Sequence, residues 1–375
     1  MIHTATLTYS PASKEMFQTF IKASGTVYYQ QDNRYINTQY KADGLIISAF
    51  MSKKNNYTAY VFICRVNFKR LIEKQNRIEV YTDADYNQMQ EKFNQIMQEN
   101  NLPLLEQWNT NRIDYCINIR TPYVKEYIKL MQKGDIPYSQ RRAYDKKNRN
   151  YSTKEGSVYL PAKARDGRSK KTGSITINFY DKQDQLKKEQ QVNKDITDEI
   201  IAQAKDILRL EVQCNKPKLE YIKSKYHLQD KKITSLLSAQ ISFDVLERAI
   251  LGVVRNGDYH RRSIALATID STNYTKQTKD KLKDILKRIA RQYKSIWKIR
   301  EELEVSGTSR TAFNEYLKKI QAAGVNPVML SESRQEKIQN IYDLFFEAFN
   351  EELYIDEIED SMQEVFDSEI EDSIE

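Results

Sequence analysis

The spacing of apolar residues changes at about Asn215, and this change limits the folds that the chain can adopt. Before Asn215, apolar stretches are short, rich in β-branched and aromatic residues, and bounded by turn residues, which is typical of strands. After Asn215, apolar residues recur mostly at helical spacing. We therefore expect an α+β fold, in which a mainly antiparallel central sheet with flanking helices is followed by a mostly helical C-terminal region.

These patterns define individual elements, of which Asn111–Arg120 is the clearest strand because apolar and polar residues alternate along it. The predicted strands are Thr4–Tyr9, Thr26–Gln30, Leu45–Met51, Tyr57–Phe68, Asn111–Arg120, Ser157–Leu160, Gly173–Asp181 and Ile207–Cys214. The predicted helices are Asp85–Glu99, Tyr123–Gln132, Asp195–Ala204, Lys216–Tyr226, Thr234–Leu237, Phe243–Arg255, Thr278–Ser295, Ile299–Glu304, Ser309–Ala323 and Glu332–Glu352. Gly134–Gly156 is predicted as a loop, and Pro161–Lys171 as a basic, hairpin-like insertion.

Charge is distributed unevenly along the chain. Residues 351–375 hold 12 acidic residues and no basic one, while the whole chain has a formal net charge of +7. Subtracting those 12 negative charges leaves +19 on residues 1–350. Such an excess of Lys and Arg attracts polyanions, so DNA, single- or double-stranded, is the expected partner. The alternative is a basic surface that only aids solubility. Binding to a membrane is not expected, because no basic stretch has a strongly apolar helical face.

Three regions follow from this organisation. Residues 1–214 are predicted as an α+β catalytic domain, and residues 215–350 as a helical DNA-binding or accessory domain. Ile299–Ala323 contains two helical patterns around a Ser-Gly-Thr turn, which is a weak helix-turn-helix signal that ordinary helical domains share. Residues 351–375 are expected to form a flexible acidic tail, or an amphipathic helix that docks on a partner.

Histidine and cysteine are scarce. The chain has 3 of each and no Cys-x-x-Cys pair, which excludes a zinc site of the usual spacing. Cys64, Cys116 and Cys214 lie in or beside apolar segments, as buried thiols do in a reducing compartment. The apolar runs are too short to span a bilayer, and the first residues lack the pattern of a secretory signal. We therefore expect a cytoplasmic protein.

The strand Asn111–Arg120 carries a first candidate site. Asp114 and Asn118 are four residues apart, so their side chains share one face of the sheet. A carboxylate there is well placed to bind a divalent cation through oxygen. The alternative is an ion pair between Arg112 and Asp114, and the residues by themselves favour that pair.

A second candidate site combines the tyrosines of Ser157–Leu160 and Ile175–Lys182. A tyrosine can attack a phosphodiester when a metal or a nearby cation stabilises the phosphate. The insertion between the two segments offers cations for DNA phosphates, namely Lys163, Arg165, Arg168, Lys170 and Lys171. Most of the 25 tyrosines must nevertheless be packing or surface residues.

A third candidate site lies on Ile207–Cys214, where Arg209 and Glu211 point to the polar face of the predicted strand. Glu211 could complete a carboxylate metal site with Asp114 if the two strands are neighbours. An ion pair between Arg209 and Glu211 on the surface of the sheet is the alternative.

Taken in chain order, the segments RIDYCIN, SVYL, ITINFYDK and LRLEV resemble the ordered blocks of rolling-circle replication initiators. The closest groups are the trans-acting plasmid initiators of Gram-positive bacteria and the phage/plasmid gene II/X-like replication proteins. FICRVNFKRL, at Phe62–Leu71, and the region Tyr316–Val328 also resemble parts of the gene II/X-like proteins. Each block is short, and their order is more specific than any one of them.

The resemblance implies a metal site and a nucleophile. Asp114 and Glu211 would bind Mg²⁺ or Mn²⁺, with Asn118 in place of the second aspartate of the family. Asparagine offers a carbonyl oxygen but no charge, which lowers the expected metal affinity. Tyr159 would be the nucleophile, although Pro161 and Ala162 follow its strand where the family often has Gly-Ser. Tyr180, in the block ITINFYDK, is the alternative nucleophile, and Lys182 would lie near the phosphate.

The implied function is initiation of rolling-circle replication of a plasmid, phage or integrative element. The protein would bind the replication origin, cut one strand through a covalent 5′-phosphotyrosine and rejoin it later. A host helicase is a candidate partner, and a second copy of the chain, which would form a homodimer, is another. The main alternative is a non-enzymatic DNA-binding regulatory or partition protein, for which Asn118 speaks. RNA binding is not supported by the motifs, because the sequence contains no RNP-like block or GxxG loop. A tyrosine recombinase is not supported either, because the arginine that such an enzyme requires near His260 is missing.

Overall fold

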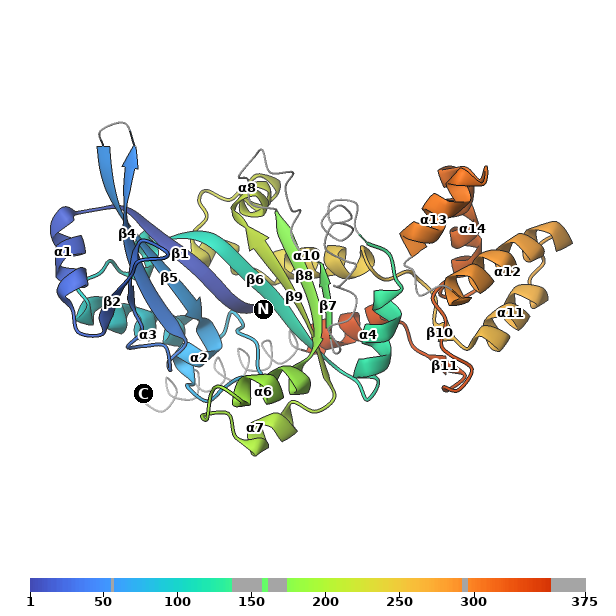
Figure 1. Cartoon of the computed structure of the whole chain (residues 1–375), viewed down its shortest axis with the longest axis horizontal. Coiled ribbons are helices and arrows are strands. Elements are labelled where there is room, and N and C mark those ends of the chain that lie inside the picture. The colour runs from blue at the N-terminus through green and yellow to red at the C-terminus, as the bar shows by residue number, and fades with distance from the viewer. Residues whose placement is uncertain (55–56, 137–156, 161–173, 292–295, 352–375) are drawn as a thin grey trace, which may run out of the picture.

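A nine-stranded antiparallel sheet runs through the molecule (Figure 1). The computed structural model describes residues 1–54, 57–136, 157–160, 174–291 and 296–351. The strand order is β2-β3-β4-β5-β1-β6-β9-β8-β7. The strands are β1 (Ile2–Ala12), β2 (Thr26–Tyr29), β3 (Arg34–Asn37), β4 (Leu45–Lys54), β5 (Tyr57–Asn67), β6 (Asn109–Arg120), β7 (Ser157–Leu160), β8 (Ile175–Asp181) and β9 (Ile207–Asn215).

The register of the central strands divides their side chains between two faces. Because directly opposite residues share a face, the pairings Thr4↔Asp114 and Asp114↔Gln213 place three polar side chains together. The pairing Cys116↔Glu211 continues the same face, which we call the polar face. The residues between them point to the opposite, apolar face.

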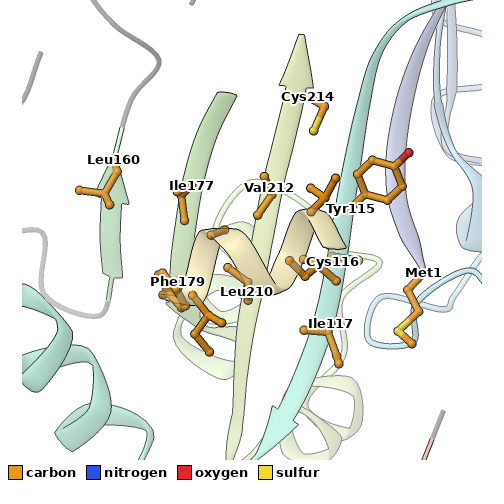
Figure 2. Close-up of a cluster of buried hydrophobic side chains, with 14 of the residues drawn as sticks. Met1, Tyr115, Cys116, Ile117, Leu160, Ile177, Phe179, Leu210, Val212 and Cys214 are labelled. Carbon is orange, nitrogen blue, oxygen red and sulfur yellow. The ribbon is translucent and has the colours of Figure 1, made fainter. Parts of the chain in front are cut away.

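The main hydrophobic core lies on the apolar face. Helix α10 (Ala239–Leu251) packs across β6 and β9 there, and Ile177, Leu210 and Val212 are buried among its neighbours (Figure 2). The hydroxyl of Tyr115 donates a hydrogen bond to the Leu236 carbonyl at 3.1 Å, which satisfies its one polar atom inside this core. The alternation of Asn111–Arg120 thus reflects one buried apolar face and one polar face.

Helices flank the sheet and become more frequent toward the C-terminus, where α11–α14 gather at the end of the molecule away from β2 and β4 (Figure 1). The first part contains α1 (Lys14–Lys22), α2 (Phe68–Ile72), α3 (Tyr86–Glu99), η1 (Leu105–Gln107), α4 (Val124–Gln132), α6 (Lys182–Gln190) and α7 (Asp198–Gln203). After β9 come α8 (Lys216–Lys225), α9 (Ile233–Leu236), α10, α11 (Arg262–Ser271), α12 (Lys276–Arg291), α13 (Ile296–Val305) and α14 (Arg310–Ala322). A small second sheet pairs β10 (Tyr259–His260) with β11 (Lys337–Ile338).

The α+β fold and the more helical C-terminal half are confirmed, and several element predictions need correction. The helix predicted over Glu332–Glu352 begins only at residue 341 and continues to 351, where the described residues end, because Lys337 and Ile338 pair with β10 instead. The predicted strand Tyr57–Phe68 stops at Asn67, whose side chain caps α2 by accepting from the Arg70 amide at 3.1 Å. Strands β3, β10 and β11, the short helix η1 and helices α1, α2, α6 and α11 were not predicted. None of the helices in the described ranges is long and apolar enough to cross a membrane.

Candidate functional site

One row of side chains crosses four strands of the polar face. Cys116 on β6 lies opposite Glu211 on β9, Glu211 opposite Asn178 on β8, and Asn178 opposite Tyr159 on β7. Four residues from four different strands, which are far apart in the sequence, thereby share one surface of the sheet. The sequence predicted Tyr159 and Glu211 as site residues, and the register assigns both to this face.

Asp114 is engaged in an ion pair on the same face. Its carboxylate accepts from Arg112 Nε at 2.8 Å and Arg112 Nη2 at 2.5 Å, and also from the Thr4 hydroxyl. Asp114 is fully buried, and burial raises the pKa of its carboxyl while Arg112 opposes that rise. The ion-pair alternative weighed from the sequence is therefore the arrangement observed, in a buried rather than a solvated setting.

Half-buried Asn118 and buried Arg209 form a second pair. Asn118 Oδ1 accepts from Arg209 Nε at 2.8 Å, and Asn118 Nδ2 donates to the Ile78 carbonyl at 2.8 Å. Arg209 Nη2 donates to the same carbonyl. The ion pair predicted between Arg209 and Glu211 is thus replaced by bonds that tie β6 and β9 to the segment around Ile78.

The predicted metal ligands do not form a cation site in this arrangement. Both oxygens of Asp114 are taken by Arg112 and Thr4, and the carbonyl oxygen of Asn118 is taken by Arg209. Asp114 and Glu211 share the polar face but are not direct cross-strand partners. Within the described residues, no group of three or more His, Cys, Asp and Glu side chains is arranged to hold a metal ion. The donor set therefore does not fit Mg²⁺ or Mn²⁺.

Glu211 instead belongs to a cleft of about 460 Å³ between the polar face and α6, which we call the Glu211 cleft. The Tyr180 hydroxyl donates to Glu211 Oε2 at 3.1 Å, and His3 Nδ1 lies 3.6 Å from the same oxygen. Burial, followed by the positive charges of Arg209 and Lys182, holds the pKa of His3 well below its usual value. Neutral His3 and Tyr180 thus surround the Glu211 carboxylate.

The two candidate nucleophiles differ in access. Tyr180 is 7% exposed, and burial together with the charge of Glu211 raises the pKa of its hydroxyl well above the usual value. A phenol held protonated in this way is a poor nucleophile. Tyr159 is 38% exposed on β7, so a substrate can reach it from solvent. The geometry favours Tyr159 over Tyr180.

Lys182 occupies the start of α6, directly after β8. It is 2% exposed, and its ammonium donates to Gln185 Oε1 at 2.7 Å. Burial and the nearby Arg209 hold the pKa of Lys182 well below its usual value. Asp181 caps the helix by accepting from the Asp184 amide at 3.1 Å. The Tyr-Asp-Lys segment therefore ends a strand and turns α6 back against the polar face.

Other predicted contacts lie outside the described residues, and one contact was missed. Lys163, Arg165, Arg168, Lys170 and Lys171 fall within residues 161–173, which the structure does not describe. His3 was not predicted as a site residue, because its meeting with Glu211 depends on β1 lying in the middle of the sheet. The alternation of residues along β1 indicates that Thr4 and Thr6 share one face, but it does not indicate which strand lies beside them.

Comparisons of the chain with protein-family models, with curated proteins and with solved structures find no match.

Proposed function

We propose that this protein is a DNA-binding replication initiator that cuts one DNA strand with Tyr159. The observation that carries the proposal is an exposed tyrosine on the polar face of the sheet, in the same cross-strand row as Glu211. The net charge of +7, which amounts to +19 over residues 1–350 once the 12 acidic residues of 351–375 are set apart, supports DNA as the partner.

In the proposed reaction, the Tyr159 hydroxyl gives its proton to solvent and its oxygen forms a bond to the phosphorus of the DNA backbone. The bond from phosphorus to the 3′ oxygen breaks, and the departing oxygen takes up a proton. The products are a 5′-phosphotyrosine and a free 3′-OH, and the stored bond allows the strand to be rejoined later. Because the predicted ligands do not fit a metal, no step is assigned to one.

Strand cutting by single-residue variants tests this proposal. Tyr159→Phe should abolish nicking of a supercoiled plasmid that carries the replication region of the element, while DNA binding stays within about twofold of wild type, since the hydroxyl is the only group removed. Tyr180→Phe is the matched control and should still nick. The open-circle product and protein bound covalently to DNA are measured on gels with and without Mn²⁺. Normal nicking by Tyr159→Phe would remove Tyr159 from the mechanism.

A second candidate function is a non-enzymatic DNA-binding regulator. The specific observation in its favour is that both carboxylate oxygens of Asp114 accept hydrogen bonds from Arg112 and Thr4. DNA binding without any cleavage, on single and double strands and across divalent metals, would favour this function over the nickase.

A further inference from the structure

A second cavity on the polar face has a different chemical character from the Glu211 cleft. It measures about 240 Å³ and lies between β1, β4, β5, α2 and α6. Its lining includes five cationic side chains, and we call it the arginine pocket: Lys41, Arg65, Arg70, Arg77 and Lys182. Glu189 is the only carboxylate among the described residues that line it.

Two arginines of the pocket hold buried donors without acceptors. The Nε–H groups of Arg70 and Arg77 are buried and have no hydrogen-bond partner among the residues that the structure describes. Arg70 is held in place on its other side, where Nη2 donates to the Ala42 carbonyl at 2.8 Å. A buried donor left without an acceptor costs about 1–3 kcal/mol, so such groups normally find a partner. An acceptor from beyond the described residues is therefore expected here.

The crowding of positive charge indicates which kind of acceptor fits. Burial and the proximity of Arg77 lower the pKa of Arg70, and burial lowers the pKa of Arg77. Lys182 and His3 also line the pocket, and each has its pKa held down by burial and by neighbouring cations. Water can accept a hydrogen bond but cannot relieve this repulsion, whereas an anion does both.

We propose that the arginine pocket binds a phosphate group. Guanidinium groups present planar pairs of donors that match phosphate oxygens, and three arginines converge on a cavity of suitable size. The phosphate has two possible sources, a DNA backbone and a free phosphate ion. His3, Gln185 and Glu189 line both this pocket and the Glu211 cleft, so the two cavities adjoin under α6. On the proposed function, a strand cut at Tyr159 would place another of its phosphates in the arginine pocket.

Binding measurements on the full chain test the phosphate site. Inorganic phosphate is titrated by calorimetry, and a labelled oligothymidylate of about 12 nucleotides by fluorescence anisotropy, with Tyr159→Phe as the background that prevents cutting. Arg77→Gln should weaken phosphate binding about tenfold, because it removes a charged donor. Arg65→Gln should act in the same direction, and Arg65 is exposed, so its loss leaves folding intact. Glu189→Gln should tighten binding, because it removes the opposing charge.

The control is Arg288→Gln, an arginine on α12 with a 47% exposed side chain, which should leave phosphate binding unchanged. If phosphate displaces the oligonucleotide and Arg77→Gln weakens both, the backbone is the source. If Arg77→Gln weakens only inorganic phosphate, the source is the free ion. No phosphate binding by wild type, or binding that is insensitive to both arginine changes, would overturn the proposal. If the protein binds phosphate through Arg77 but never nicks DNA, the phosphate site is supported and the proposed nicking function is wrong.

Discussion

The pKa of His3 shows how the surroundings on the polar face change the protonation of a single residue. Its imidazole lies 3.6 Å from Glu211, which favours the charged form, but burial and the cations of Arg209, Lys182, Arg112 and Arg65 oppose it. The balance holds the pKa of His3 well below the ordinary value of 6.5. In the folded protein the ring therefore stays neutral at pH values where the unfolded chain takes up a proton.

This difference predicts a loss of stability in acid. As the pH falls below 6.5, the unfolded state binds a proton at His3 and the native state does not, so the free energy of unfolding decreases until the native pKa is reached. Each unit between the two pKa values costs about 1.4 kcal/mol. His3→Gln should therefore lose less stability than wild type between about pH 7.5 and about pH 5 in urea unfolding. If the free energy of unfolding depends on pH in the same way in both proteins, His3 is not the source of the acid sensitivity. His260, whose pKa is also lowered, contributes equally to both proteins.

At the scale of elements, the strand with a strict alternation was predicted closely, whereas helix α6, which has few apolar residues, was not. Asn111–Arg120 was expected from its alternation and is β6 with two added residues. Helix α6 was missed because Leu186 is the only apolar residue in KQDQLKKEQ, so the helix depends on its cap and on tertiary contacts. Which site residues meet was not predictable, because the pairing of Glu211 with Tyr180 and His3 follows from strand order, which local patterns do not encode.

The approach of β4 to α2 gives a prediction about glycine. Gly44 has φ +81°, and a Cβ there would lie 2.8 Å from Arg70 Cβ and 3.0 Å from the Asn67 carbonyl oxygen. Gly324 has a similar φ of +77° but nothing within 4 Å of an added Cβ. Gly324→Ala should cost about 1–2 kcal/mol from backbone strain alone, and Gly44→Ala about 2 kcal/mol more from overpacking. Urea unfolding of both variants measures the difference, and equal losses would mean that Arg70 moves aside freely.

Across the whole molecule, the last described helix connects the C-terminal region to the core of the sheet. In helix 341–351, Phe345 and Phe349 are buried against Phe243 of α10, with ring centroids 5.8 and 4.9 Å apart. One buried cluster contains these rings and also Ile113 of β6. The division of the chain at residue 215 stays a prediction, and the core is continuous across it.

A pair of phenylalanine changes measures this connection. Phe345→Ala should lower the free energy of unfolding of the whole protein by about 3–5 kcal/mol, because the side chain is fully buried. Phe346→Ala, one residue further on, should cost less than about 1 kcal/mol, because Phe346 is 47% exposed. Thermal unfolding monitored by circular dichroism reports both. Similar losses in the two variants would argue against docking of this helix through Phe345.

The charge asymmetry of the chain makes a separate prediction. Residues 351–375 carry 12 acidic residues, so their deletion should tighten non-specific DNA binding at low salt, with a difference that shrinks as salt screens the charges. Fluorescence anisotropy with a random duplex at two salt concentrations measures the effect. An unchanged dissociation constant at low salt would exclude a competing role for these residues.

The position of β1 also bears on how the protein is made. Strand β1 lies between β5 and β6, so its first described edge partner is absent until Tyr57–Asn67 has been synthesised, and its second edge stays open until Asn109–Arg120 follows. β9, which supplies Glu211, arrives later still. Pairings this distant in sequence slow folding and leave unpaired strand edges exposed in the meantime. During translation, the growing chain therefore passes through a period in which its central strand is free to pair with other chains.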